Sequence, residues 1–586
     1  METVGHRRAS TARREPKGAA EGGDRGLLNP WLRRGARAIQ STFGLAVASA
    51  VLLGLAFPPI GLAAVIWVAP APLLLLVRRQ AWPRARWPYA RLYAAGFVSW
   101  LLILHWLRLP HWAGYVSWPA LAALMAIYFP LFVAVARVMV HRLGVSVVVA
   151  APVAWTAGEL FRAHFLGGFS MASLYHAHYR WLALIQVADL AGGLTLSFVI
   201  MLAAACLARM IPWDGKRAAL WPIAPAVLAV AATLAYGYHR LGEIDTATPS
   251  STNSGEATSV KVALIQGSFN TEFVYDPDRP KRIIEGMSQR TRAALDAEPD
   301  LDLVIWPETM FFAAWENAAF TEDLRKFAIQ GLNRFGKYHA ALLTGAEVRE
   351  TSGDGGSSQT KGYNSALFVA PDGEIVGRYD KMNPVMFGEY IPFGEQFPWL
   401  YQLSPLRGGL TAGARPEALA IPVRGAADDN GGDAPTVTFC PSICYESVLP
   451  HHVRGSVATL AAEGKPVDVL VNLTNSGWFW GSSELDLHLM CNVFRAVECR
   501  KPMLVAANTG FSAWIDAAGR IRRQGKRHQE DTVIAQVSST RIFSRYVAWG
   551  DWLGGICLGL CGLAAVFEVV CRGIRGRRLF FGQSRA

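Results

Sequence analysis

The stretch TVTFCPSICYESV, residues 436–448, joins a β-strand pattern to a group of chemically active side chains. Two cysteines, Cys440 and Cys444, lie four residues apart at the end of an apolar run, and Cys444 leads directly into Tyr445 and Glu446. This pattern fits a reactive thiol at the tip of a strand. It also fits a core strand that holds two small residues able to be buried.

Six similar runs of β-branched or aliphatic residues, each closed by turn residues, occupy the C-terminal half of the chain. They are VKVALIQG (260–267), LDLVIWPE (301–308), ALLTGAEV (341–348), NSALFVAPDG (364–373), VDVLVNLTNSG (467–477) and MLVAANTG (503–510). Amphipathic stretches of helical length, such as 278–297 and 484–500, separate several of them. Strands that alternate with helices predict an α/β domain over residues 260–540.

The composition of the whole chain is typical of a membrane protein. Of 586 residues, 52% are apolar and only 17% are charged, a balance that is unusual for a soluble enzyme. Seven apolar runs precede residue 240 and an eighth follows the α/β domain, each close to the roughly 20 residues that a transmembrane helix needs. They predict eight transmembrane helices, at 41–57, 61–77, 92–107, 118–136, 145–160, 183–207, 218–238 and 547–570.

Arginine and lysine are concentrated in the first forty residues, in every second gap between the apolar runs, and after the last run. The positive-inside rule then places both termini in the cytoplasm and the α/β domain outside it. Because the net charge of +12 follows this distribution, we expect no nucleic-acid binding. The predicted organisation is a basic tail (1–40), a membrane domain (41–240), a linker (241–259), the α/β domain (260–540), a last span (545–571) and a basic tail (572–586).

Three chemically active residues follow predicted strands: Glu308, Lys381 and Cys444. A thiol, a carboxylate and an ammonium together can supply a nucleophile, a proton acceptor and an oxyanion-stabilising charge. A free thiol with a pKa near about 8.5 is a weak nucleophile at neutral pH, so Glu308 is expected to take its proton. Lys381 and the Tyr445 N–H are expected to hold the oxyanion. The cysteine spacing contains no zinc motif, and we expect no metal and no cofactor.

Four motifs resemble those of the nitrilase superfamily. IWPET (305–309), YDKMNPVMFGEY (379–390) and ICYES (443–447) match its Glu, Lys and Cys motifs in order, and NLTNSGWFWG (472–481) resembles the stretch after the cysteine. Because predicted spans lie on both sides of the α/β domain, residues 41–571 resemble the membrane-bound apolipoprotein N-acyltransferase family. The resemblance implies an αββα sandwich and acyl transfer from a membrane phospholipid, through a cysteine thioester, to diacylglyceryl-modified apolipoproteins. It also implies a monomer in the bacterial inner membrane with its catalytic domain on the periplasmic side.

Carried over by position, the resemblance makes Cys444 the nucleophile, Glu308 the proton acceptor and Lys381 the oxyanion-stabilising cation. Supporting roles are implied for four further residues: Glu389, Tyr445, Glu446 and Asn364. The chain departs from the family motif at residues 383–386, and at Tyr275, where the family has a tryptophan.

Other interpretations of the same residues stay open at this stage. A membrane-tethered amidase would use the same three residues on small amides, although it would not need eight spans. A third interpretation is a non-catalytic membrane scaffold, but a scaffold would have no reason to keep Glu308, Lys381 and Cys444 together. A Cys440–Cys444 disulfide would consume the nucleophile, and we expect Cys440 to be packed instead. Glu159 and Asp189 are expected to make internal hydrogen bonds, and His488 to lie on a helix face without binding a metal.

Overall fold

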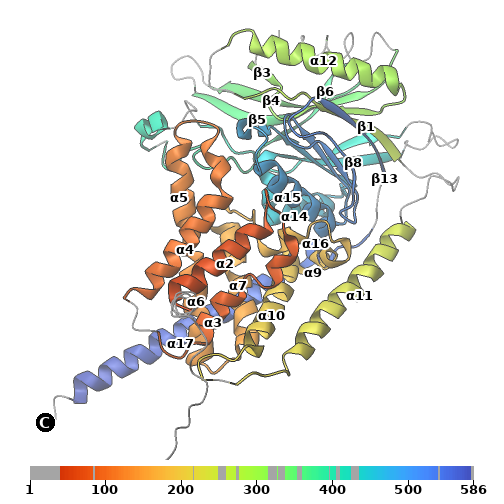
Figure 1. The fold of residues 1–586 in the computed structure, drawn as a ribbon. Helices are drawn as coiled ribbons and strands as arrows, with labels where there is room; N and C mark the ends of the chain where they lie inside the picture. Colours follow the sequence, from red (N-terminus) through yellow and green to blue (C-terminus); the bar gives the residue numbers. More distant parts are fainter. Residues whose placement is uncertain are drawn as a thin grey trace, which may run out of the picture.

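A computed structural model shows an α/β domain resting on one end of a helical domain (Figure 1). The structure describes residues 40–582 except 83–85, 216, 248–258, 272–275, 315–325, 327–336, 353–358, 395, 404–408, 424–434 and 539–541.

Two β-sheets form the centre of the α/β domain. The first contains β1 (Ser259–Gln266), β2 (Leu303–Ile305), β3 (Phe311–Ala314), β4 (Ala341–Ser352), β5 (Gln359–Val369), β6 (Ile375–Asp380) and β13 (Asp531–Ser538), in the order β13-β1-β2-β4-β5-β6 with β3 beside β4. The second contains β7 (Leu419–Pro422), β8 (Thr436–Ile443), β9 (Val469–Thr474), β10 (Met503–Ala507), β11 (Ala513–Ile515) and β12 (Ile521–Gln524), in the order β12-β11-β10-β9-β8-β7. All seven predicted strands are present. The short or charged strands β3, β6, β7, β11, β12 and β13 were not predicted.

The sheets pack face to face because their strands alternate in the direction of their side chains. In β1, Val262 and Leu264 face the second sheet, whereas Ala263 and Ile265 face α12 (Arg279–Ala297). The outer face of the second sheet is covered by α14 (Pro450–Ala462) and α15 (Glu484–Cys499). These four layers are the predicted αββα sandwich.

Strand β8 explains how the proline in the opening stretch is tolerated. β7 pairs with β8 only from Thr436 to Phe439, whereas β9 pairs with it from Phe439 to Ile443. Pro441 therefore lies where β8 has a neighbour on one side only, and its missing N–H leaves no gap in a ladder. The strand ends at a 3₁₀ turn, η7 (Cys444–Val448).

The helical domain is made of segments that follow the predicted apolar runs. Its main helices are α2 (Thr42–Ala56), α3 (Ala71–Arg78), α4 (Pro88–Ile103), α5 (Gly114–Ala126), α6 (Tyr128–His141), α7 (Val147–His164), α10 (Leu194–Met210), α11 (Ile223–Ala247) and α17 (Trp552–Gly582). Its short helices are η1 (Ala63–Trp67), η2 (His105–Arg108), η3 (Phe165–Gly167), η4 (Leu174–His178), α8 (Leu182–Ile185) and α9 (Ala188–Ala191). The short helices η6 (Pro398–Leu403) and η8 (Ser476–Phe479) belong to the α/β domain, and α16 (Arg545–Trp549) precedes α17.

The sixth predicted span was expected to be one helix over 183–207, and this prediction is wrong. The segments Leu182–Ala191 and Leu194–Met210 are bent by 116°. The break lies at Gly192, whose φ of 75° is a left-handed conformation that glycine adopts without a Cβ clash.

Among the described residues, two helical segments are long and apolar enough to cross a membrane, Gly114–His141 and Trp552–Arg572, and the bent pair makes a third if it is one span. Two more, Thr42–Ala56 and Ala63–Arg78, are apolar but shorter. These helices fit membrane association, while the count of eight spans stays a prediction.

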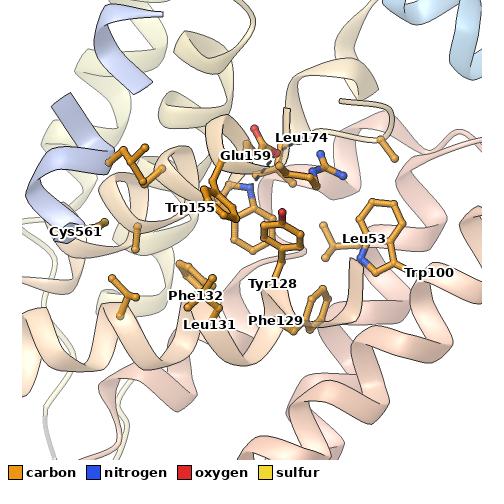
Figure 2. A pocket seen from close by; sticks show the side chains of 18 of the residues that line it. Leu53, Trp100, Tyr128, Phe129, Leu131, Phe132, Trp155, Glu159, Leu174 and Cys561 are labelled. Carbon is orange, nitrogen blue, oxygen red and sulfur yellow. Dashed lines mark hydrogen bonds between the residues drawn. The ribbon is translucent and has the colours of Figure 1, made fainter. Parts of the chain in front are cut away.

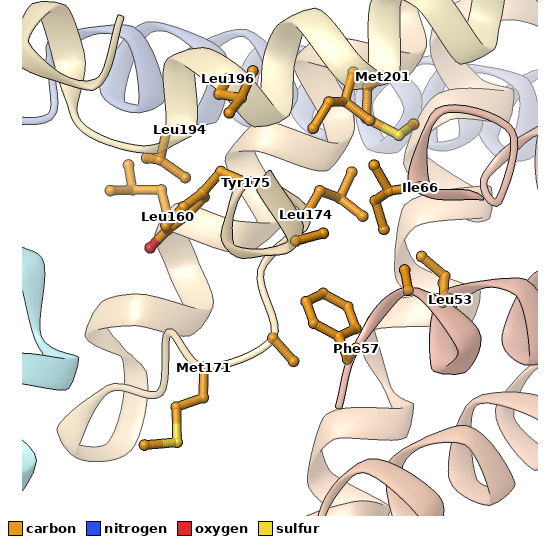
Figure 3. Packing of buried hydrophobic residues seen from close by; sticks show 14 of the residues in the cluster. Leu53, Phe57, Ile66, Leu160, Met171, Leu174, Tyr175, Leu194, Leu196 and Met201 are labelled. Atoms are coloured by element: carbon orange, nitrogen blue, oxygen red, sulfur yellow. The ribbon is translucent and has the colours of Figure 1, made fainter. Parts of the chain in front are cut away.

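One apolar core runs through both domains. Leu53, Phe57, Leu174 and Met201 pack together inside the helical domain (Figure 3). The same cluster continues through Val493 on α15 to the outer face of the second sheet. The two domains therefore share a core.

A buried ion cluster also joins the two domains. Asp189, on α9, is 3.0 Å from Arg500 Nε at the end of α15 and 2.6 Å from Arg240 Nη2 on α11, each measured to Asp189 Oδ2. The Arg500 Nη2 also donates to the Gln186 carbonyl oxygen at 2.8 Å. Because Asp189 and Arg500 are fully buried, each charge depends on its partner. Asp189 makes the internal contacts expected of it.

We expect Asp189→Ala to destabilise the full chain by about 3–5 kcal/mol, because it removes the carboxylate that lies between two buried guanidinium groups. The midpoint of thermal unfolding in detergent micelles measures this. Glu417→Ala is the matched control: it breaks a 2.8 Å pair with Arg415, whose side chain is 70% exposed, and such a surface pair contributes about 0–1 kcal/mol. Equal midpoints for the two variants would contradict the cluster's role.

Candidate active site

Side chains at or just after the ends of strands from both sheets converge at the candidate site. Glu308 comes three residues after β2, Lys381 directly after β6 and Cys444 directly after β8. Asn364 lies within β5, where it pairs with Glu347 of β4. Strand ends hold side chains rigidly while leaving them accessible, which suits a reaction centre.

The Lys381 ammonium is the centre of this group. Its side chain is 2% exposed, and its Nζ lies 2.8 Å from Glu389 Oε1 and 3.5 Å from Glu308 Oε1. Burial by itself lowers the pKa of Lys381, but the negative charges of Glu389 and Glu308 outweigh it and raise that pKa above the usual value. Lys381 therefore stays protonated at neutral pH.

The Glu308 carboxylate is held from both sides. Its Oε1 accepts from Asn364 Nδ2 at 2.7 Å, and its Oε2 accepts from the Asn475 backbone N–H at 2.8 Å. Gly345 of β4 lies so close that a Cβ there would be 2.5 Å from the Glu308 Cα. This close approach of two backbones requires glycine. Glu308 is buried, so it is not a surface charge.

Glu389 attaches the segment after β6 to the same cluster. Its Oε1 accepts from Lys381 Nζ and from Asn364 Nδ2, the latter at 3.2 Å. Its Oε2 accepts from the Val385 N–H at 2.7 Å. The departure from the family motif at 383–386 therefore lies within a turn that Glu389 closes. Tyr275 lies outside the described residues.

Cys444 begins the η7 turn in a conformation that non-glycine residues rarely adopt, with φ of 51°. Its side chain is partly exposed, and both Cys444 and Cys440 are free thiols. Burial raises the pKa of the Cys444 thiol, Glu308 adds to the increase and Lys381 opposes it. The net pKa is raised, so the thiol is protonated at neutral pH. Cys440 is buried and packed, as predicted.

Glu446 links the turn of the cysteine to the turn of the lysine. Its Oε2 accepts from the Ile443 N–H and from the Tyr379 hydroxyl, both at 2.7 Å. Its Oε1 accepts from the N–H groups of Met382 and Asn383, at 2.7 and 3.0 Å. Glu446 therefore positions the backbone on both sides of the cluster.

Tyr445 reaches the helical domain. Its hydroxyl donates to the carbonyl oxygen of Gly168, in the loop after α7. In the same loop, the Ser170 hydroxyl donates to the Val448 carbonyl oxygen at the end of η7. The turn that carries Cys444 is thus anchored on the helical domain.

Three contacts at the site were not predicted. Asn475 supplies the N–H to Glu308, and Asn472 Nδ2 donates to the Cys444 carbonyl oxygen at 3.2 Å. His488 Nε2 lies 3.1 Å from that same oxygen. The two asparagines belong to the Asn-rich motif at 472–481, which could have signalled them. His488 was expected only on a helix face, and α15 does carry it.

A separate apolar cavity of about 290 Å³ lies inside the helical domain (Figure 2). Leu53, Phe129 and Phe132 are among its apolar walls. Glu159 lies at its edge, where Oε1 accepts from Trp155 Nε1 at 3.0 Å and from the Leu174 N–H at 2.9 Å. These are the internal hydrogen bonds expected of Glu159. The volume is close to the lower end of the range of about 300–1,000 Å³ for small-ligand pockets.

The arrangement at Cys444 can carry out covalent acyl transfer. The protonated Cys444 thiol needs a base, and the buried Glu308 carboxylate lies in the same cluster. The charged Lys381 ammonium can stabilise a developing oxyanion. The described residues bring together all the residues predicted for the site: Glu308, Asn364, Lys381, Glu389, Cys444, Tyr445 and Glu446.

Comparison with known proteins gives matches over both domains. Residues 49–206 match the model of the apolipoprotein N-acyltransferase N-terminal domain, and residues 261–545 match that of the carbon-nitrogen hydrolases. An apolipoprotein N-acyltransferase of Geobacter metallireducens is 32% identical, over 90% of this chain and 95% of its own length. One of Rhodopirellula baltica is 29% identical, over 90% and 97%.

Among solved structures, Nit3 of Saccharomyces cerevisiae, a member of branch 10 of the nitrilase superfamily, is 18% identical with a TM-score of 0.32, over 48% of this chain and 90% of that one. The carbon-nitrogen hydrolase match agrees with the two-sheet architecture of the C-terminal domain. With near-complete coverage at 32% identity and both of its domains matched, the chain belongs to the apolipoprotein N-acyltransferase family.

Proposed function

We propose that this chain transfers a fatty acyl group from a membrane phospholipid, through a Cys444 thioester, to the N-terminal amine of a diacylglyceryl-modified lipoprotein. Apolipoprotein N-acyltransferase is the name of relatives that match nearly the whole chain. The observation that carries the proposal is the buried Lys381 ammonium between Glu308 and Glu389, in the cluster that contains Cys444.

The first half of the reaction forms the thioester. Glu308 takes the thiol proton as the Cys444 sulfur attacks the carbonyl carbon of the phospholipid ester. The oxyanion that develops is held by the Lys381 ammonium and the Tyr445 N–H; one such donor typically contributes about 2.7–4 kcal/mol. The ester C–O bond then breaks, Glu308 returns the proton to the leaving oxygen, and a lysophospholipid departs.

The second half transfers the acyl group to nitrogen. A neutral α-amine attacks the thioester carbon, and Glu308 accepts the amine proton as the new C–N bond forms. The same two donors hold the second oxyanion. The C–S bond breaks, the proton passes to the sulfur, and the Cys444 thiol is restored with an amide as product.

The amidase alternative is not favoured. A small-amide hydrolase has no need of the helical domain, whose match to the N-acyltransferase model covers residues 49–206. The apolar cavity within that domain suits a hydrocarbon chain better than a small polar amide.

Since every residue of the cluster comes from one chain, we also propose that the enzyme acts as a monomer.

We further propose eight spans, both termini in the cytoplasm and the catalytic domain on the periplasmic side of the bacterial inner membrane. In support, the cationic ends of the helices lie together: Arg137 Nη1 donates to the Leu76 carbonyl oxygen at 2.9 Å, and Arg142 is 3.7 Å from Glu568 of α17. The catalytic domain lies at the opposite end of the bundle (Figure 1). This polarity agrees with the positive-inside rule.

Phospholipid with a labelled acyl chain should leave label on the purified full-length protein. The label should be released by hydroxylamine, as expected for a thioester, and should be absent from Cys444→Ala. Cys440→Ala is the matched control, because it removes a thiol four residues away that is buried in the core. Loss of label in Cys440→Ala with label kept in Cys444→Ala would overturn the choice of nucleophile.

Glu308→Gln should slow thioester formation by roughly 10²–10⁴-fold, the usual contribution of a positioned base. The amide keeps the shape of the side chain, while it cannot accept the thiol proton. Single-turnover labelling with excess enzyme measures the rate. Glu417→Gln, at the exposed Arg415 pair, should behave as the unmodified protein, and an unchanged rate in Glu308→Gln would remove the role assigned to Glu308.

A further inference from the structure

The carbonyl oxygen of Cys444 receives three side-chain contacts at once. Asn472 Nδ2 donates to it at 3.2 Å, the Ser447 hydroxyl at 3.3 Å, and His488 Nε2 lies 3.1 Å away. His488 Nε2 is also 2.9 Å from Ser447 Oγ. All three side chains are buried. Because a carbonyl oxygen can only accept, His488 donates to it in the tautomer that carries the imidazole hydrogen on Nε2.

These contacts fix the direction of the next N–H group. The Cys444 carbonyl and the Tyr445 N–H belong to one planar trans peptide unit, in which C=O and N–H point in opposite directions. Holding the oxygen toward Asn472 and His488 therefore aims the Tyr445 N–H to the other side. Hydrogen bonds to the carbonyl also polarise the peptide and strengthen its N–H as a donor.

The same peptide follows the strained residue of the turn. A left-handed φ at a residue other than glycine is unfavourable and persists only where the surroundings hold it. The φ of 51° at Cys444 is such a case. Asn472 of β9 and His488 of α15 converge on its carbonyl together with Ser447 of η7 itself, so two other elements hold the turn.

We propose that His488 is a positioning residue that, with Asn472, aims the Tyr445 N–H at the oxyanion of the acyl-transfer reaction. The inference rests on the proposed function, since it assigns the oxyanion to that reaction. His488 touches the carbonyl of the nucleophile residue, so its effect on the chemistry passes through the peptide. Asn472 comes from the strand beside β8 and His488 from the helix that covers the sheet.

The imidazole is neutral in this setting. Burial lowers the pKa of His488 to about 4, the hydrogen bond to the Cys444 carbonyl partly opposes this, and the Lys381 charge lowers it further. A neutral ring can donate one hydrogen bond without adding a second positive charge beside Lys381. This suits a residue that orients a backbone group.

His488→Met tests the inference, because methionine fills a similar length with an apolar side chain and lacks the Nε2–H donor. Thioester formation from labelled phospholipid should fall at least about tenfold, toward the 10²–10³-fold loss that removal of an oxyanion donor typically causes. Alkylation of Cys444 by iodoacetamide develops no oxyanion, so its rate should stay within about twofold of the unmodified protein. His488→Gln, which can still donate, should recover part of the thioester rate.

Two further variants complete the test. Ser447→Ala removes another donor to the same carbonyl with little change in packing, and should reduce thioester formation a few-fold without changing alkylation. His178→Met is the matched control: His178 is a buried histidine whose ring nitrogens have no hydrogen-bond partner among the described residues, and both rates should be unchanged.

The outcomes separate the inference from the proposed function. If the unmodified protein forms the Cys444 thioester and His488→Met forms it equally fast, the inference is overturned and the proposed function stands. If alkylation and thioester formation fall together in His488→Met, the histidine acts on the thiol or on the fold, and the inference is again overturned. If the unmodified protein forms no Cys444 thioester, both are overturned.

Discussion

A buried ammonium group imposes the central constraint on this site. Taking a lysine side chain out of water costs several kcal/mol unless opposite charges lie beside it. Lys381 is buried, and two carboxylates from different parts of the chain surround it: Glu308 after β2 and Glu389 from the segment after β6. Asn364 donates to both carboxylates and so holds their spacing. Neutralising the Lys381 charge therefore requires the segments that carry Lys381, Glu308 and Glu389 to lie together.

A third carboxylate, that of Glu446, transmits this arrangement to the nucleophile. Glu446 accepts hydrogen bonds from the backbone just after Lys381 and from the backbone just before Cys444. A shift of either turn would leave buried N–H groups unpaired, at a cost of about 1–3 kcal/mol each. The cation and the thiol are therefore held in register although they come from different sheets.

The helical domain is part of this framework and not only an anchor. Tyr445 and Val448, on both sides of Glu446, are hydrogen-bonded to the loop after α7. That loop continues into the segment whose Leu174 N–H meets Glu159 at the edge of the apolar cavity. The turn that carries Cys444 and the apolar cavity are thus joined through one continuous packed core.

The sequence by itself determined the seven main strands and the order of the motifs, because alternating apolar patterns and turn residues are local properties of the chain. The αββα class followed from the resemblance of those motifs to the nitrilase superfamily. The sequence also placed Glu308, Lys381 and Cys444 at strand ends. Only the tertiary structure decided which backbone groups Glu446 holds, how α9 and α10 bend apart, and that His488 faces the Cys444 carbonyl. Every residue of α15 except Asp486 is buried, so its pattern does not distinguish the face toward the site. Such contacts join residues tens of positions apart, and local periodicity contains no information about which distant side chain completes a buried hydrogen bond.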